Sequence, residues 1–154
     1  TRYGKTPDTL QDLSISLQRV GDLAQQTGDL TTATTHHNEK LALDRDRITR
    51  YGKTPDTLKA LSISLTRIAL LAMARQLDDD AADALWQATR VARDVFRLTG
   101  FGDAFGVKLL NWCLDEWAAA EERAGDAESA GEIRTERRVL EADYDRWLRD
   151  NAIR

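Results

Sequence analysis

The chain has 154 residues, 42% hydrophobic and 31% charged, with a net charge of −4 at pH 7. That length is typical of a single domain with a sizeable core. The one cysteine, Cys113, excludes an internal disulfide framework and a thiolate zinc site.

The charge is spread unevenly along the chain. Residues 1–52 carry no net charge, residues 53–100 carry +1 and residues 101–154 carry −5. Because general nucleic-acid binding requires a basic surface that neutralises phosphates, we expect no nucleic-acid partner. No uninterrupted apolar run approaches the roughly 18 residues of a membrane span, so we expect no membrane partner.

The ten-residue segment TRYGKTPDTL occurs twice, at Thr1–Leu10 and Thr49–Leu58. Leu-Ser-Ile-Ser-Leu follows both copies, so the chain contains a tandem repeat with a period of 48 residues. Periods of roughly 20–50 residues are typical of solenoids and arrays. The chain starts at a repeat junction and lacks an initiator Met, so we expect it to be the C-terminal part of a larger protein. We expect that protein to be cytoplasmic.

The first repeat predicts two antiparallel helices. Thr6 is the expected N-cap, with Pro7 at the first helical position. The first helix is expected to end at Gly28-Asp29 and the second to run from Leu30 to Gly52, which can adopt the left-handed cap. Their apolar stripes are predicted at Leu10, Leu13, Leu17, Val20 and Ala24, and then at Ala33, His37, Leu41 and Ile48.

The second repeat restarts this pattern at Thr54-Pro55-Asp56 and is expected to end at Gly100. Within it, Asp78–Asp80 form an acidic helix start. A third, divergent unit carries the turn Gly125-Asp126 and ends in the most charged helix, as a terminal repeat facing solvent requires. The prediction is an all-α single domain of three helical hairpins, with units at about residues 6–52, 54–100 and 103–151.

Residues 19–41, RVGDLAQQTGDLTTATTHHNEKL, resemble tetratricopeptide repeats. Val20-Gly21 stands where that family has Leu-Gly, Gly28-Asp29-Leu30 stands at the inter-helix turn, and Ala33 at a small position of the second helix. The repeat is longer than the usual period of about 34 residues, so the resemblance is to long-helix bacterial variants, in which a segment like Asp12–Leu17 precedes Gly-Asp. It is strong over residues 1–100 and weaker over 101–154. The chain departs from the family pattern where Gly21 is replaced by Ala69 and Ala118, and where the Gly-Asp turn is lost at Gln76-Leu77.

The resemblance implies a right-handed α-solenoid that binds a peptide or partner domain on the concave face of its first helices. It implies no catalytic residue, no metal and no cofactor. The positions expected on this face are Ile15, Gln18, Arg19, Asp22, Ile63, Thr66, Arg67, Leu70, Trp112, Asp115, Glu116 and Ala119.

Arg19 and Arg67 are repeat equivalents, so we expect a short basic ladder opposite Asp115 and Glu116. The alternative is that both arginines form salt bridges with Asp22 or with neighbouring carboxylates. The Lys and Asn pattern that clamps a peptide C-terminus in some family members is absent.

The expected function is a protein-interaction scaffold, with self-association through exposed repeat ends as a further possibility. The alternative is a sensor or regulatory domain of a larger bacterial signalling or defence protein, attached to a nucleotide-switch ATPase or another effector.

Other chemically suggestive residues have structural explanations. His36 and His37 diverge by about 100° on a helix, so they cannot share a metal, and His37 is expected in the core. Cys113 is expected to be an inert buried thiol, and Asp78–Asp80 lack the spacing of a calcium loop. Gly100, Gly102 and Gly106 are expected to form a helix–helix connection. The four tryptophans either fill the core or mark interaction hot spots (Trp86, Trp112, Trp117, Trp147).

Overall fold

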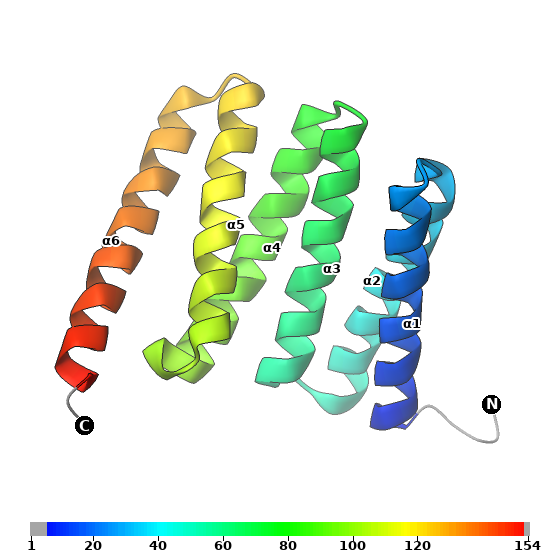
Figure 1. Ribbon diagram of the computed structural model, residues 1–154, viewed down its shortest axis with the longest axis horizontal. Helices are drawn as coiled ribbons and strands as arrows, with labels where there is room; N and C mark the ends of the chain where they lie inside the picture. The colour runs from blue at the N-terminus through cyan, green and yellow to red at the C-terminus, as the bar shows by residue number, and fades with distance from the viewer. Residues whose placement is uncertain (1–5, 153–154) are drawn as a thin grey trace.

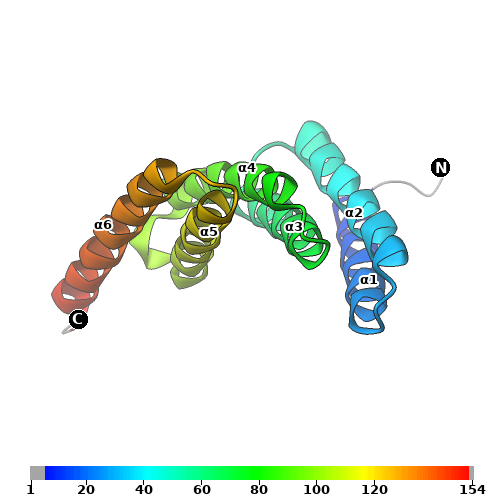
Figure 2. The same ribbon diagram turned by 90° about the horizontal axis from the view of Figure 1, so that it is seen from above.

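The computed structural model describes residues 6–152, which are all-helical. The six helices are α1 (Pro7–Gln26), α2 (Leu30–Tyr51), α3 (Pro55–Ala74), α4 (Asp78–Thr99), α5 (Ala104–Arg123) and α6 (Ala127–Asn151). Each helix packs against the next in chain order (Figure 1). Seen from above, α1, α3 and α5 lie along the inner side of a curved row, and α2, α4 and α6 along the outer side (Figure 2).

The helix starts confirm the predicted caps. The Thr6 hydroxyl accepts a hydrogen bond from the Thr9 N–H at 3.2 Å, and the Thr54 hydroxyl accepts one from the Thr57 N–H at 3.1 Å. The Thr57 hydroxyl also donates to the carbonyl of Gly52, which ends α2 at φ +86. The second copy of TRYGKTPDTL therefore stops one helix and starts the next. The first five residues of the first copy lie outside the described residues.

The apolar stripe predicted for α1 is only partly buried. Of the predicted stripe, Leu13 and Val20 are 49% and 47% exposed. Leu23 of the same helix is 60% exposed, whereas Leu71, which stands 48 residues after it, is 3% exposed. Leu71 is covered by three residues of the preceding hairpin, Ala24, Leu30 and Ala33. The equivalent face of α1 has no preceding hairpin in the described part of the chain, which explains the exposure.

Helix α3 is, by length and composition, long and apolar enough to cross a membrane. This was not expected from the sequence, because α3 contains no long uninterrupted apolar run. Half of its most apolar 18-residue window is buried inside the structure. Its apolar residues pack against the neighbouring helices, with Leu65 and Ala69 in two core clusters. The core helix of a soluble protein has the same properties, so this is weak support for a membrane span.

The connection between α4 and α5 is shorter than predicted. Gly100 takes φ +65 and begins a short 3-10 turn that ends at Gly102, but Gly106 lies in the first turn of α5. A Cβ on Gly106 would lie 2.9 Å from Oδ2 of Asp103. Asp103 in turn binds Lys59 of α3 at 2.7 Å, and this contact lowers the pKa of its carboxyl group.

The turn between α3 and α4 lacks two features of the first hairpin. Gln76 adopts φ +59 at the position equivalent to Gly28, which has φ +83. Left-handed backbone costs a residue with a side chain about 1 kcal/mol relative to glycine. Leu77 at the N-cap of α4 makes no side-chain hydrogen bond, whereas Asp29 at the N-cap of α2 accepts one from the Thr32 N–H at 3.1 Å.

We expect Gln76→Gly with Leu77→Asn to raise the free energy of unfolding by about 1–2 kcal/mol, through relief of the strained turn and a restored N-cap. Asn is preferred to Asp because Asp78–Asp80 follow directly. Urea denaturation measures the change, and the reciprocal variant Gly28→Gln should lose about 1 kcal/mol. A double variant no more stable than the parent would contradict this account of the turn.

Candidate functional site

A cluster of polar side chains is buried where α1, α2 and α3 meet. Asp44 is fully buried and accepts hydrogen bonds from the Ser14 hydroxyl at 2.9 Å, the Lys40 ammonium at 2.7 Å and the Ser64 hydroxyl. The Lys40 ammonium also donates to Ser64 at 2.6 Å. Arg47 completes the set, with Nη1 3.5 Å from Oδ1 of Asp44. We refer to these five residues as the Asp44 cluster.

The Asp44 cluster joins the first hairpin to the second through buried charges. Lys40 and Asp44 are 3% and 0% exposed. A buried ion pair gains little net stability over a well-packed apolar pair, but losing one partner leaves the other charge unpaired and is costly. The cluster therefore fixes the position of α3 relative to α2, because the Ser64 hydroxyl must lie within hydrogen-bonding distance of both Lys40 and Asp44.

The charged positions of the cluster are apolar at the next junction. Ala88, Ala92 and Val95 of α4 stand 48 residues after Lys40, Asp44 and Arg47, and Cys113 of α5 stands at the position equivalent to Ser64. Ala88, Ala92 and Cys113 belong to one apolar core cluster. Burial raises the pKa of the Cys113 thiol to about 12, which agrees with the predicted inert thiol. The charged junction is thus specific to the first hairpin.

The burial of the Asp44 cluster was not predicted from the sequence. Lysine, aspartate and arginine on a helix usually indicate a solvated face. The signal was the register: the buried positions of α2 are Ala33, His37, Lys40, Asp44 and Arg47. Their repeat equivalents include Leu85, Ala88 and Ala92, which are all apolar. This face of α2 is therefore expected in the core even though it carries charged residues.

A second polar contact on the same hairpin surrounds His37. The imidazole of His37 is fully buried, with Nε2 3.5 Å from Oδ1 of Asp22. Arg67 of α3 also contacts this carboxylate at 3.4 Å. The ring packs on Gly21, where an added Cβ would lie 2.7 Å from Cε1 of His37. His37 is therefore a packed inter-helix histidine, as predicted, and His36 lies 4.0 Å from Glu39.

Stability should fall as the pH drops below neutrality because of His37. Burial lowers the pKa of His37, the carboxylate of Asp22 opposes this, and electrostatic interactions with Arg67, Lys40 and His36 act in the same direction as burial. The unfolded chain then takes up a proton below about pH 6.5 while the folded chain does not. The contribution of His37 is fully present above that pH and is lost toward the lower folded-state pKa.

His37→Leu, which installs the residue found at Leu85, should flatten this dependence. The measurement is the free energy of unfolding of parent and variant between pH 7 and pH 5. We expect the variant to gain stability relative to the parent at the acid end. An equal pH dependence in both chains would show that His37 does not titrate differently on folding.

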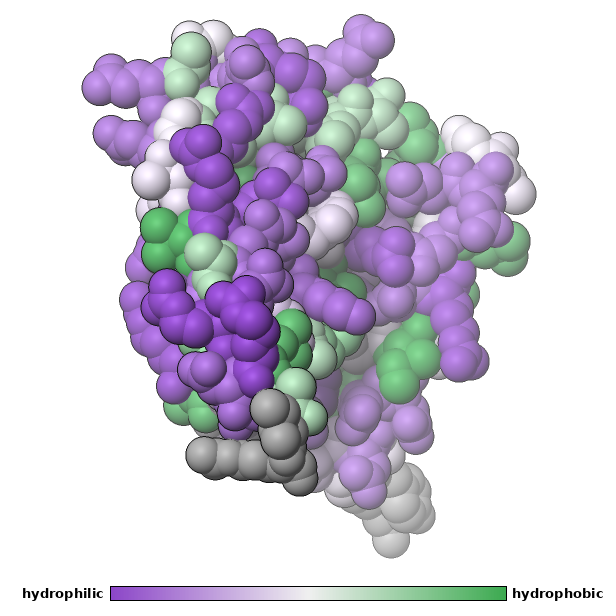
Figure 3. Space-filling model, turned by 60° about the vertical axis from the view of Figure 1, so that its left-hand side comes forward, coloured by the Kyte–Doolittle hydropathy of each residue, from purple (hydrophilic) through white to green (hydrophobic). Residues whose placement is uncertain are grey.

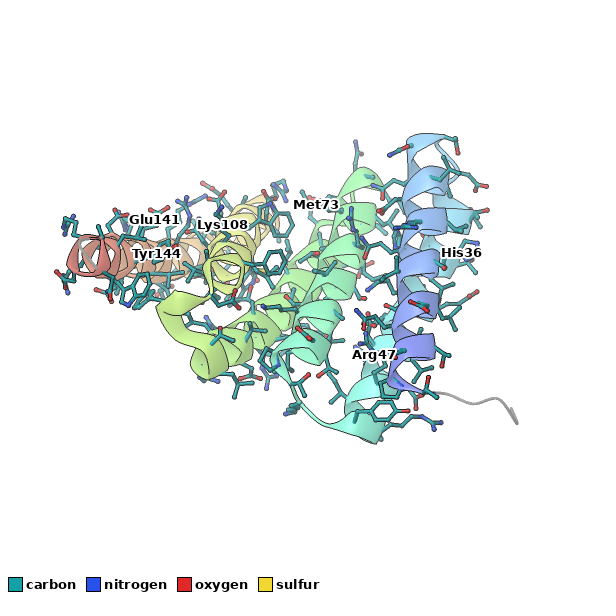
Figure 4. All side chains as sticks on the ribbon, turned by 60° about the horizontal axis from the view of Figure 1, so that its bottom comes forward. His36, Arg47, Met73, Lys108, Glu141 and Tyr144 are labelled. Carbon is teal, nitrogen blue, oxygen red and sulfur yellow. The ribbon has the colours of Figure 1, made fainter. Side chains whose placement is uncertain are left out.

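The residues predicted on the concave face are only partly brought together. Ile15, Gln18 and Ile63 line one pocket of about 290 Å³ between α1 and α3. Its other lining residues are Gln11, Ser14, Lys40, Arg47, Asp56, Lys59 and Ala60. We call this the α1–α3 pocket. Arg47, seen between the ribbons of α1 and α3 in Figure 4, reaches it from α2.

The two predicted arginines behave differently. Arg67 forms the ion pair with Asp22, which was the alternative to a free basic ladder. Arg19 is exposed and forms no ion pair within residues 6–152. Neither arginine lines the α1–α3 pocket.

The predicted residues of the third unit lie apart from this pocket. Trp112 is 36% exposed, and the Asp115 carboxylate lies 3.8 Å from Arg137 of α6. Glu116 is half-buried. Trp86 is 40% exposed beneath the Arg90 guanidinium, 4.9 Å from the ring centroid, whereas Trp117 and Trp147 are half-buried.

The outer end of the molecule is polar. In Figure 3, hydrophilic residues cover most of the face on the α6 side, in agreement with the charged terminal helix expected from the sequence. A second pocket of about 390 Å³ lies between α5 and α6, where Figure 4 labels Lys108, Glu141 and Tyr144. Tyr144 stacks on Phe101 at 5.8 Å and on Trp147 at 6.2 Å between ring centroids, so this end is held by aromatic packing.

Within residues 6–152, no group of three or more His, Cys, Asp or Glu side chains is arranged to hold a metal ion. Comparison with known proteins adds no assignment to this geometry: no family model, no curated protein and no solved structure matches the chain.

Proposed function

We propose that the chain is a tetratricopeptide-like α-solenoid that acts as a protein-interaction module. In this proposal a peptide or partner domain binds along the side of the row formed by α1, α3 and α5. The observation that carries it is the α1–α3 pocket, because residues of two successive repeats line it together with a buried cation.

The lining of the pocket suits an extended peptide. Ile15 and Ile63 stand 48 residues apart, at the same repeat position, and both line the pocket. Ile15 is 41% exposed, so it offers apolar surface to a ligand. The side-chain amides of Gln11 and Gln18 provide donors and acceptors for a peptide backbone. Apolar walls with a few polar groups are the usual composition of a ligand site.

The test is selection of binders from a displayed library of random peptides, followed by affinity measurement with Ile15→Glu. We expect the wild-type chain to select peptides, and the variant to bind them at least roughly tenfold more weakly, since a charge replaces an apolar contact. Leu98→Glu is the matched control, because Leu98 is 57% exposed on α4, outside the pocket. Equal loss in both variants, or no selected peptide, would contradict the proposal.

A regulatory domain of a larger protein is the second candidate, favoured by the exposed stripe of α1. Leu23 stands at the repeat position of Leu71, which packs on the preceding hairpin, and Leu13 and Val20 of the same helix are also exposed. A further helical segment packed on this face of α1 would connect these six helices to an effector domain. Slower amide hydrogen exchange in α1 of a longer natural polypeptide than in the 154-residue chain would support this role, and equal exchange would count against it.

A further inference from the structure

We infer that the α1–α3 pocket is a recognition site for one carboxylate, the side chain of an Asp or Glu within a bound peptide, and that Arg47 is the residue that binds it. The inference rests on the proposed function, because it names the ligand group that the peptide-binding face would take. It is based on the Arg47 guanidinium, which is buried and cationic and forms a single long hydrogen bond, to Asp44.

Arg47 is well buried yet barely bonded. Its side chain is 9% exposed, and within the described residues its only hydrogen bond is the one from Nη1 to Asp44, at 3.5 Å. That distance is at the outer limit of a hydrogen bond. A guanidinium offers five N–H donors. No nitrogen of Arg47 is among the fully buried, unbonded polar atoms, so its free donors keep contact with solvent through the pocket.

Asp44 cannot neutralise Arg47 because it is already occupied. Its carboxylate accepts hydrogen bonds from Lys40, Ser14 and Ser64, all of them shorter than the contact from Arg47. The Asp44 cluster holds two cations, Lys40 and Arg47, against one anion. Within the cluster one positive charge therefore has no carboxylate of its own, and the largely buried guanidinium would gain from an anion that enters the pocket.

The remaining charges near the pocket favour a singly charged ligand. The Lys59 ammonium is bonded to Asp103 at 2.7 Å, so that pair is neutral, and Asp56 is exposed at the rim. Asp56 forms no ion pair within residues 6–152 and is exposed, so water screens its charge and it does not partner the Arg47 guanidinium. A carboxylate ligand carries the one negative charge that the Asp44 cluster itself lacks. A phosphate dianion would exceed it and would meet Asp56. The planar guanidinium also matches a carboxylate through two parallel hydrogen bonds.

The rest of the lining places the carboxylate on a side chain within a continuing peptide. Ile15 and Ile63 flank the charged centre from α1 and α3, so apolar peptide residues can pack beside the acidic one. The ligand is therefore an internal Asp or Glu with apolar neighbours. The second repeat has no such centre, because Val95 stands where Arg47 does.

The experiment repeats the displayed-peptide selection on three chains: wild type, Arg47→Val and Arg50→Val. Arg47→Val installs the residue found at the equivalent position of the second repeat. Arg50→Val is the matched control, because it removes the same charge from the same helix, and Arg50 pairs with Asp46 outside the pocket. Displayed peptides continue into the carrier protein and have no free C-terminus, so an acidic preference must come from side chains.

We expect acidic residues with apolar neighbours to be enriched by wild type and by Arg50→Val, and not by Arg47→Val. A selected peptide, synthesised with an amidated C-terminus, should lose affinity for wild type by roughly thirty-fold or more on Glu→Gln substitution. The same substitution should change nothing for Arg47→Val. The Glu→Gln peptide tests the inference on the wild-type chain alone, even where a variant folds poorly.

The outcomes distinguish the carboxylate site from peptide binding itself. Peptides selected by wild type without acidic enrichment, or with enrichment that survives Arg47→Val, would overturn the carboxylate site and leave peptide binding intact. No selected peptide at all would reject the proposed function, and the carboxylate site with it.

Discussion

Asp44→Ala is expected to lower the free energy of unfolding by about 3–5 kcal/mol. The substitution leaves Lys40 and Arg47 buried without their shared anion, and it removes the acceptor of the Ser14 and Ser64 hydroxyls. Native domains are stable by only about 5–15 kcal/mol, so the loss is a large fraction of the total. Thermal unfolding should show a fall in Tm on the order of 10 °C.

The control for Asp44→Ala is the double variant Lys40→Met/Asp44→Ala. It removes a cation along with the anion, so the net charge of the buried cluster is unchanged, and methionine preserves most of the lysine volume. We expect it to be more stable than Asp44→Ala by about 2 kcal/mol, since an unpaired buried charge is gone. A double variant that loses the sum of both single changes would show that Asp44 acts through packing and not through charge.

Gly21→Ala is expected to lower the free energy of unfolding by about 2 kcal/mol through overpacking. The new Cβ would lie 2.7 Å from Cε1 and 2.8 Å from Nε2 of His37. The His37 ring is fully buried between α1 and α2, so it has no free space to move into. The measurement is the midpoint and slope of urea unfolding for parent and variant.

The second repeat supplies the rescue for Gly21→Ala. Ala69 and Leu85 occupy the positions equivalent to Gly21 and His37, and both are fully buried there. Gly21→Ala combined with His37→Leu should therefore regain most of the lost stability, with a coupling of about 1 kcal/mol or more between the two sites. Additive losses would contradict the steric explanation.

Local signals predicted the helix boundaries well. Thr6 and Thr54 as caps, Pro7 and Pro55 at first helical positions, and Gly52 at a positive φ depend on neighbouring backbone atoms only. Which face of a helix is covered depends on residues far along the chain. That is why the stripe predicted for α1 holds at Leu10 and Ala24 but not at Leu13 and Val20, which are exposed.

The candidate site was predicted less completely than the fold. The repeat positions of Ile15, Gln18 and Ile63 placed them on one face, and they line one pocket. The cation in that pocket was missed, because Arg47 looks like a solvated residue unless its register is compared with Val95. For Arg67 the sequence left two possibilities, a basic ladder and a salt bridge with Asp22, and the structure has the salt bridge. The choice depends on the distance between α1 and α3, which sequence spacing does not contain.

The most direct test of the proposed binding face is NMR mapping of a selected peptide on the wild-type chain. We predict saturable shifts of backbone amides in residues 11–18 of α1 and 56–63 of α3, together with the side-chain Nε–H of Arg47, and their loss in Ile15→Glu. Shifts confined to α2, α4 and α6, on the outer side of the row, would contradict a binding site between α1 and α3.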